Sequence, residues 1–124
     1  MSVRYSIDKA ERLIISVGES VVGFHDIKDH QNRLRADPDF DPTFDQLIDA
    51  IRIDRLELTA DEARILASRS LFSPGSRRAL VAPKPAIFGL FRMMEVYHEG
   101  RAKVHVFDFL DEALNWLGKS LPAG

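Results

Sequence analysis

The sequence predicts one α/β domain over residues 1–124, with a five-stranded, mostly parallel mixed sheet, an antiparallel N-terminal edge strand and about four helices. The chain of 124 residues has the usual length of a single domain. Its 45% hydrophobic and 29% charged residues are ordinary for a globular protein. Strand-like and helix-like segments follow in the order β-β-α-β-α-β-α-β-α, which favours right-handed crossovers between parallel strands.

The first two strands are expected to form a hairpin. Residues 3–7 alternate apolar and polar side chains, and residues 12–17 form a more apolar strand after a turn. The first strand is therefore expected at an antiparallel edge of the sheet. Gly18-Glu19-Ser20 is expected to end the second strand, and a helix is expected from about Val22 to Ala36, where Pro38 stops it.

Turn residues and a capping motif organise the middle of the chain. Residues 37–42 contain two prolines among aspartates and predict a loop, and residues 47–51 predict a central strand. Thr59 and Glu62 match a capping box, in which each side chain accepts a hydrogen bond from the backbone amide of the other residue. The helix that follows is expected to end near Ser70.

The last part of the chain predicts two further strand–helix pairs. Residues 78–82 predict a short strand, and residues 86–98 predict a third helix that Gly100 ends. Residues 103–107 alternate as a last strand, and residues 110–117 predict a terminal helix closed by Gly118.

Composition narrows the class of protein. With no cysteine, the chain has no disulfide, no thiol nucleophile and no thiolate metal site. The N-terminus has no long apolar core of a signal peptide, and no segment approaches the ~20 apolar residues of a membrane helix. We therefore expect a soluble, cytoplasmic protein without a membrane partner.

Charge is distributed unevenly. Residues 63–94 contain Arg64, Arg69, Arg77, Arg78, Lys84 and Arg92 and no acidic residue. Either this segment neutralises the acidic first half of the chain, or it forms a face that attracts anions. Nucleic-acid binding is not expected, because the sequence pI is about 6.1 and no recognition motif is present.

No motif for catalysis, cofactor binding or metal binding is present. The histidines lack metal-ligand spacing, and neither a nucleophile elbow nor a nucleotide-binding glycine loop occurs. Asp26 and His30 are four residues apart and predict a weak interaction on a helix surface. We expect no enzymatic activity, no cofactor and no metal. A small enzyme would need His98 or His105 beside a carboxylate such as Asp49 or Asp54.

The predicted third helix carries more apolar residues than one packed face requires. Its apolar arc spans roughly 160°, against the ~100° of a surface helix. The helix is either buried unusually deeply or exposes an apolar patch for self-association or for an apolar ligand. The candidate surface for a homodimer or an apolar ligand consists of Phe88, Phe91, Met93 and Val96.

Several segments together carry a resemblance to a known superfamily. They are Asp37–Asp41, Ser73–Arg78, Phe88-Gly89-Leu90 with Arg92-Met93, and Asp111–Leu117. On these residues nearly the whole chain resembles the STAS superfamily, typified by the SpoIIAA-like anti-sigma-factor antagonists, and it is most similar to a branch of small bacterial proteins. The resemblance implies sequentially ordered strands flanked by helices, and a regulatory role through protein contacts.

The resemblance also directs attention to the start of the second helix. Regulatory STAS proteins carry a phosphorylatable serine there, whereas this chain has Ala60 or Asp61 at that position, so the usual phosphoswitch is not expected. Thr59, Ala60, Asp61 and Lys84 are the candidate partner or ligand surface, since strand ends in α/β sheets form the usual ligand crevice. The alternative to a partner-binding module is a carrier of a lipid-like or anionic metabolite, held between the third helix and the sheet.

Overall fold

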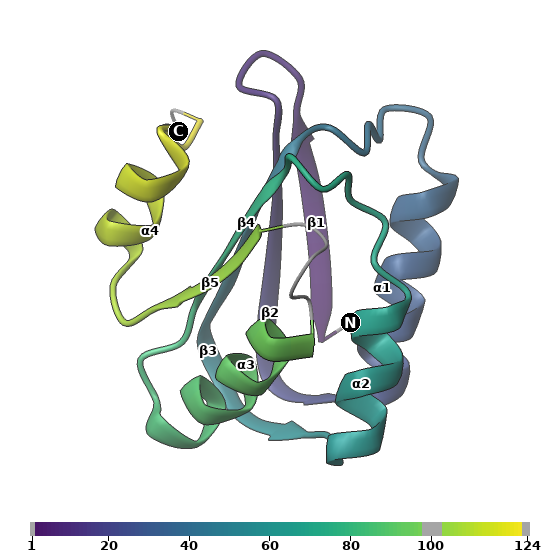
Figure 1. Ribbon diagram of the computed structural model, residues 1–124, viewed down its shortest axis with the longest axis vertical. Helices are drawn as coiled ribbons and strands as arrows, with labels where there is room; N and C mark the ends of the chain where they lie inside the picture. The colour runs from purple at the N-terminus through teal and green to yellow at the C-terminus, as the bar shows by residue number, and fades with distance from the viewer. Residues whose placement is uncertain (1, 98–102, 123–124) are drawn as a thin grey trace.

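The computed structural model describes residues 2–97 and 103–122. Its elements follow the predicted order (Figure 1). The strands are β1 (Val3–Asp8), β2 (Leu13–Gly23), β3 (Asp45–Glu57), β4 (Arg77–Val81) and β5 (Lys103–Phe107). The helices are α1 (Phe24–Ala36), α2 (Ala60–Ser68), α3 (Pro85–Tyr97) and α4 (Leu110–Leu117).

The strands form one sheet in the sequential order β1-β2-β3-β4-β5. β1 pairs with β2 in antiparallel fashion, and each of the other neighbouring pairs is parallel. The predicted five-stranded mixed sheet with an antiparallel N-terminal edge strand is therefore confirmed. Single-helix crossovers between adjacent parallel strands produce this order.

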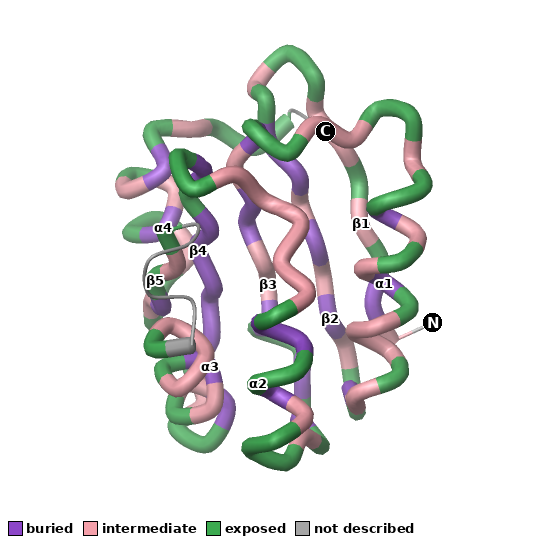
Figure 2. The backbone as a smooth tube through the Cα atoms, turned by 45° about the vertical axis from the view of Figure 1, so that its right-hand side comes forward, coloured by how far each residue is buried: buried purple, intermediate pink, exposed green. Residues whose placement is uncertain are grey.

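The helices cover the two faces of the sheet unequally. Neighbouring residues of a strand point to opposite faces, so Leu80 and Val81 belong to different layers. Leu80 packs in a core with Ile87 and Phe91 of α3, whereas Val81 packs with Ala113 of α4. In Figure 1, α1 and α2 lie to the right of the strands and α3 lies in front of them, whereas α4 lies to the left and covers part of the other face. In Figure 2 the buried residues concentrate along β2, β3 and β4.

The prediction that residues 18–20 end the second strand is wrong. β2 continues to Gly23 through register shifts between Val17 and Glu19 and between Ser20 and Val21. A Cβ atom on Gly18 would lie 2.7 Å from the Cδ1 atom of Ile53, so glycine permits the close approach of β2 to β3. Backbone pairing with the long strand β3 outweighs the local turn signal, and α1 consequently begins at Phe24.

Local capping determines where the helices begin and end. The Thr59 hydroxyl accepts from the Glu62 amide at 3.1 Å, and the Glu62 carboxylate accepts from the Thr59 amide at 3.0 Å, which confirms the predicted capping box. At the end of α4, Gly118 adopts a left-handed φ of 67°, a conformation that glycine reaches without a steric penalty. The expected end of the third helix at Gly100 lies outside the described residues.

Candidate functional site

A largely apolar cavity of about 80 Å³ lies between the sheet and the three helices on its more heavily covered face. Its apolar wall is contributed by β2, β3, α1, α2 and α3, and includes Val22, Ile27, Ile53, Leu66 and Phe91. Its polar wall is formed by Ser16, His30, Gln31, Ser70 and Arg78. Both kinds of side chain thus border the same space.

A chain of buried hydrogen bonds crosses the polar wall. The Arg78 Nε–H donates to the Gln46 Oε1 atom at 2.9 Å, and the Gln46 Nε2 group donates to the Ser16 Oγ atom at 2.9 Å. Ser16 Oγ lies 2.9 Å from His30 Nε2. All four side chains are at most 9% exposed. Buried polar groups persist in a core when each finds a partner, and this chain joins three strands to α1.

The register of the sheet assembles these residues. Gln46 of β3 lies directly beside Arg78 of β4, and Ser16 of β2 lies beside Ile48. Because side chains two residues apart share a face, Gln46 and Ile48 point to the same side of the sheet. His30 reaches this side from α1. The polar groups therefore gather from segments that are far apart in the sequence.

His30 is a neutral imidazole in this environment. Its pKa is lowered from 6.5 to about 4, mainly by burial and further by the positive charges of Arg33 and Arg78, against the opposing effect of Asp29. Since Ser16 Oγ accepts from Gln46, its own proton is directed to His30 Nε2, which assigns the Nδ1–H tautomer to the ring. Ser16 and His30 thus form a hydroxyl–imidazole pair, but the bond from Gln46 reduces the basicity of the serine oxygen.

Arg78 places a positive charge at the cavity wall. Its guanidinium carbon lies 4.8 Å from the centre of the Phe72 ring, which is a cation–π distance. Burial lowers the pKa of Arg78 to about 10, so the group remains protonated at neutral pH. Desolvation of a cation is expensive, and the low dielectric around this side chain strengthens its attraction for negative charge.

The Ser70 hydroxyl also lines the cavity, just beyond the end of α2. Its oxygen is buried and has no hydrogen-bond partner among the described residues. A buried hydroxyl without a partner costs about 1–3 kcal/mol. Ser70 therefore adds one polar group to the lining of the cavity.

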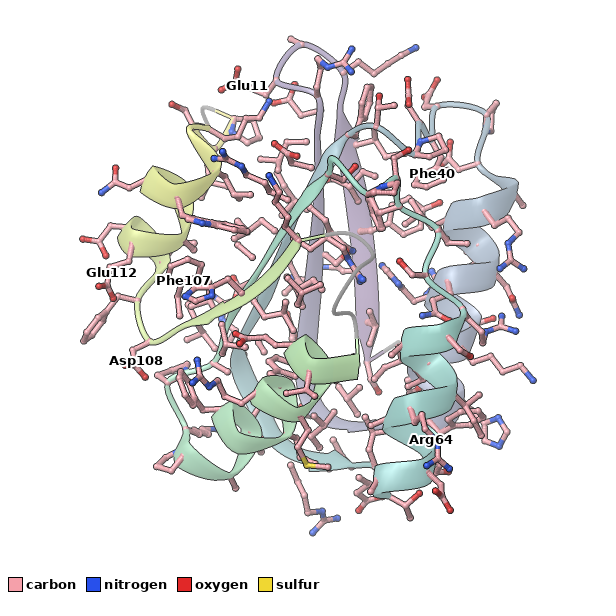
Figure 3. The ribbon with its side chains drawn as sticks, in the orientation of Figure 1. Glu11, Phe40, Arg64, Phe107, Asp108 and Glu112 are labelled. Atoms are coloured by element: carbon pink, nitrogen blue, oxygen red, sulfur yellow. The ribbon has the colours of Figure 1, made fainter. Side chains whose placement is uncertain are left out.

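The predicted partner surface lies elsewhere. Thr59, Ala60 and Asp61 are exposed at the N-terminus of α2, where Thr59 acts as the helix cap and Asp61 pairs with Arg64. Figure 3 shows Arg64 on the outer side of this helix. Lys84 instead donates to the Ile53 carbonyl at 2.7 Å and to Asp54 at 3.2 Å. Among the described residues, no hydrogen bond or ion pair joins Lys84 to the α2 N-terminus.

The four residues of α3 that were predicted to form a dimer or apolar-ligand surface differ in their exposure to solvent. Phe91 is buried and lines the cavity, and Phe88 packs at the edge of the same core. Met93 is half-buried, and Val96 is 66% exposed. Of these four residues, Phe91 is therefore part of the core, and Val96, which lies outside the predicted apolar arc, faces solvent.

The cavity's polar residues were not identified from the sequence. The expected surface pair of Asp26 and His30 is wrong, because the Asp26 carboxylate accepts from the Gly23 amide and His30 is buried against Ser16. A signal was available: His30 is three residues after Ile27 and four before Leu34, on the apolar face of α1. The strand positions of Ser16, Gln46 and Arg78 gave no comparable signal.

The side chains considered for metal binding or for catalysis have other neighbours in the described structure. No group of three metal-ligating side chains occurs in residues 2–97 and 103–122. His105 Nδ1 lies 3.8 Å from Glu95, whereas Asp54 pairs with Lys84 and Asp49 accepts from the Ile51 amide. His98 lies outside the described residues. None of the helices in the described part of the chain combines the length and hydrophobicity needed to cross a membrane.

The described contacts of the basic residues in segment 63–94 do not place them together on one surface of the molecule. The partners of its members lie on several elements: Arg69 donates to Gln31 and Asn32 of α1, and Arg77 donates to the Trp116 carbonyl of α4. Arg78 is the member that faces the cavity. The segment therefore supplies one cation to the candidate site.

Comparison with known proteins identifies the fold. No known protein family matches the sequence, and no curated protein matches it. An uncharacterized protein from the DUF3478 family with a SpoIIAA-like fold, from Shewanella loihica PV-4, is similar in structure, with a TM-score of 0.62 over 94% of each chain. The sequence identity is 18%, so the likeness concerns the fold. The chain therefore has a SpoIIAA-like fold, as its sequence resemblance predicted.

Proposed function

We propose that this chain is a STAS-type binding module that holds a small molecule in the cavity between α1, α2, α3 and the sheet, without catalysing a reaction. The observation that supports this function is the cavity itself. Protein interiors are close-packed and contain few voids larger than a water molecule. A space of about 80 Å³ lined largely by apolar side chains, with a few polar groups, is therefore a candidate ligand site.

The size of the cavity favours a small molecule over a lipid-like ligand. A volume of about 80 Å³ is roughly half that of an apolar cavity of ~150 Å³ that accommodates benzene. A lipid acyl chain would not fit inside it. The ligand is accordingly a molecule of a few heavy atoms.

The proposal is tested by filling the cavity from α2. Leu66 is buried and lines the cavity, while its neighbour Ile65 is 46% exposed on the outside of the same helix. We expect native mass spectrometry of freshly purified protein to show an additional small mass on the wild-type chain. The mass should persist in Ile65→Phe and disappear in Leu66→Phe, with far-ultraviolet circular dichroism confirming that both variants fold. An extra mass that persists in folded Leu66→Phe would contradict binding in the cavity.

A second candidate function is a protein contact through the outer surface of α3. Its support is Val96, an apolar side chain of α3 that is 66% exposed. In this case the wild-type chain should form a homodimer in light scattering, and Val96→Glu should be monomeric. Ile65→Glu, on the neighbouring helix, serves as the control and should remain dimeric. A strictly monomeric wild-type protein that captures no partner would remove this candidate, as well as a contact through Thr59, Ala60 and Asp61.

A further inference from the structure

The outer edge of β1 presents backbone groups that do not bond to β2. In an antiparallel pair, residues that exchange backbone hydrogen bonds with the partner strand alternate with residues whose groups point outward. The Glu19 amide donates to the Ser2 carbonyl at 2.8 Å, so the even-numbered residues of this segment face β2. The amides and carbonyls of Val3, Tyr5 and Ile7 therefore point away from the sheet.

A side chain of α1 occupies one of these outward groups and leaves others unpaired. Arg33 Nη2 donates to the Val3 carbonyl at 3.0 Å. Among residues 2–97 and 103–122, the outward groups of Tyr5 and Ile7 have no partner. An open groove follows this edge, lined by residues 4–7 of β1 and by α1 and the loop after it. Unpaired groups along a strand edge are a template for pairing with another strand.

The opposite edge of the sheet is more closed. The Lys103 amide donates to the Ser76 carbonyl at 3.0 Å, so the backbone groups of Val104 and Val106 point away from β4. The outward amide of Val106 donates to Glu95 Oε1 of α3 at 2.5 Å. This carboxylate occupies a donor that an added strand would need. In the described part of the chain, β1 is therefore the edge better suited to strand addition.

The side-chain charges on β1 favour a second copy of this chain as the added strand. Tyr5 and Ile7 pack on the face that α1 covers. Arg4, Ser6 and Asp8 alternate with them and share the opposite face. In an antiparallel pair of two β1 strands centred on Ser6, Arg4 of each copy lies directly opposite Asp8 of the other. Opposite charges in directly opposed positions stabilise a strand pair, and like charges destabilise it.

Other registers satisfy these groups less well. A pair centred on Tyr5 would oppose Arg4 to Ser6, without a charge pair. That register would also need the Val3 carbonyl, which Arg33 already occupies. A pair centred on Arg4 would oppose two arginines. The register centred on Ser6 is therefore favoured.

The side chains involved remain open to a second copy. Arg4 is exposed and uses Nη1 to contact Glu19, and Asp8 uses Oδ1 to accept from the Glu11 amide at 3.1 Å. The other guanidinium nitrogens of Arg4 and the Oδ2 atom of Asp8 have no partner among the described residues. Ser6 is exposed, and its hydroxyl has no hydrogen bond in the same part of the chain.

We propose that the outer edge of β1 is a homodimer interface, in which two copies pair antiparallel about Ser6 and join their sheets into one continuous sheet. Tyr5 and Ile7 of each copy then exchange backbone hydrogen bonds with Ile7 and Tyr5 of the other. The two contacts are equivalent, as in any dimer with twofold symmetry. This interface does not depend on the cavity, and it differs from a contact through Val96 of α3.

The first test is sedimentation velocity of the whole chain in a dilution series up to about 1 mM protein. We expect a monomer–dimer equilibrium for the wild-type chain. Ser6→Lys places two lysines opposite each other at the centre of the interface and should weaken dimerisation about tenfold. Val96→Glu, also at an exposed position, is the control and should dimerise as the wild type does. Far-ultraviolet circular dichroism checks that each variant folds.

A charge exchange tests the register. Arg4→Glu and Asp8→Lys should each weaken dimerisation about tenfold, because each opposes like charges across the interface. The double variant restores unlike charges and should recover most of the affinity, as expected for residues in direct contact. Double-variant dimerisation no stronger than that of the single variants would overturn this register.

Hydrogen exchange of the Tyr5 and Ile7 amides gives a readout on the wild-type chain itself. Both amides lack a partner in the single chain, so their protection should rise with protein concentration. A wild-type chain that stays monomeric throughout the dilution series, with both amides exchanging rapidly, would overturn the proposal. A dimer that is lost in Val96→Glu and kept in Ser6→Lys would overturn it in favour of α3.

Discussion

Replacing His30 with glutamine should reduce the dependence of stability on pH. In the folded chain the pKa of His30 is about 4 because the ring is buried, whereas its ordinary value is 6.5. Between these values the unfolded chain binds a proton that the folded chain does not, so acidification lowers the free energy of unfolding. For a fall from pH 7 to pH 4.5, the contribution of this one residue is a loss of about 2 kcal/mol.

Urea denaturation at the two pH values, followed by circular dichroism, measures this loss. Carboxyl groups with lowered pKa values, such as Asp37 and Asp41, also lose stabilising interactions on acidification, but they do so in both proteins. The glutamine side chain retains an acceptor for the Ser16 hydroxyl and does not titrate. The wild-type chain should therefore lose about 2 kcal/mol more than His30→Gln. Equal losses would refute the conclusion that His30 is buried as a neutral ring.

Two further predictions concern helix ends. Thr59→Ala removes a hydrogen bond of the capping box and should lower the free energy of unfolding by about 1 kcal/mol, measured by urea denaturation; Thr59→Ser should retain most of it, and an equal loss in both variants would contradict the capping role. Gly118→Ala forces a side chain into a left-handed backbone conformation and should lower the melting temperature, with a cost of about 1 kcal/mol. A control substitution at Gly75, which is not in that conformation, should have a smaller effect.

Much of the fold could be predicted because its signals are local. Alternation of apolar residues located β1 and β5, and the spacing of single helices between strands gave the order of the parallel sheet. Capping residues gave the start of α2 and the end of α4. The extension of β2 to Gly23 could not be predicted, because it depends on pairing with the distant strand β3 and on the close approach of Gly18 to Ile53.

The candidate site could not be predicted because it has no local signature. Ser16, Gln46 and Arg78 are single polar residues in three separate strands, and only the sheet register brings them together. Ser70 lies beyond a helix end, and the absence of a hydrogen-bond partner for its hydroxyl among residues 2–97 and 103–122 depends on packing rather than on sequence. The prediction of an apolar third helix contributed one correct element, since Phe91 lines the cavity.

Electron density in the cavity tests the central claim most directly. Crystals of the wild-type chain, grown from freshly purified protein, would show any occupant at atomic detail. We predict density for a small molecule between the sheet and the helices, in contact with Leu66 and Phe91. A cavity that contains only ordered water, or that is closed by neighbouring side chains, would contradict the account.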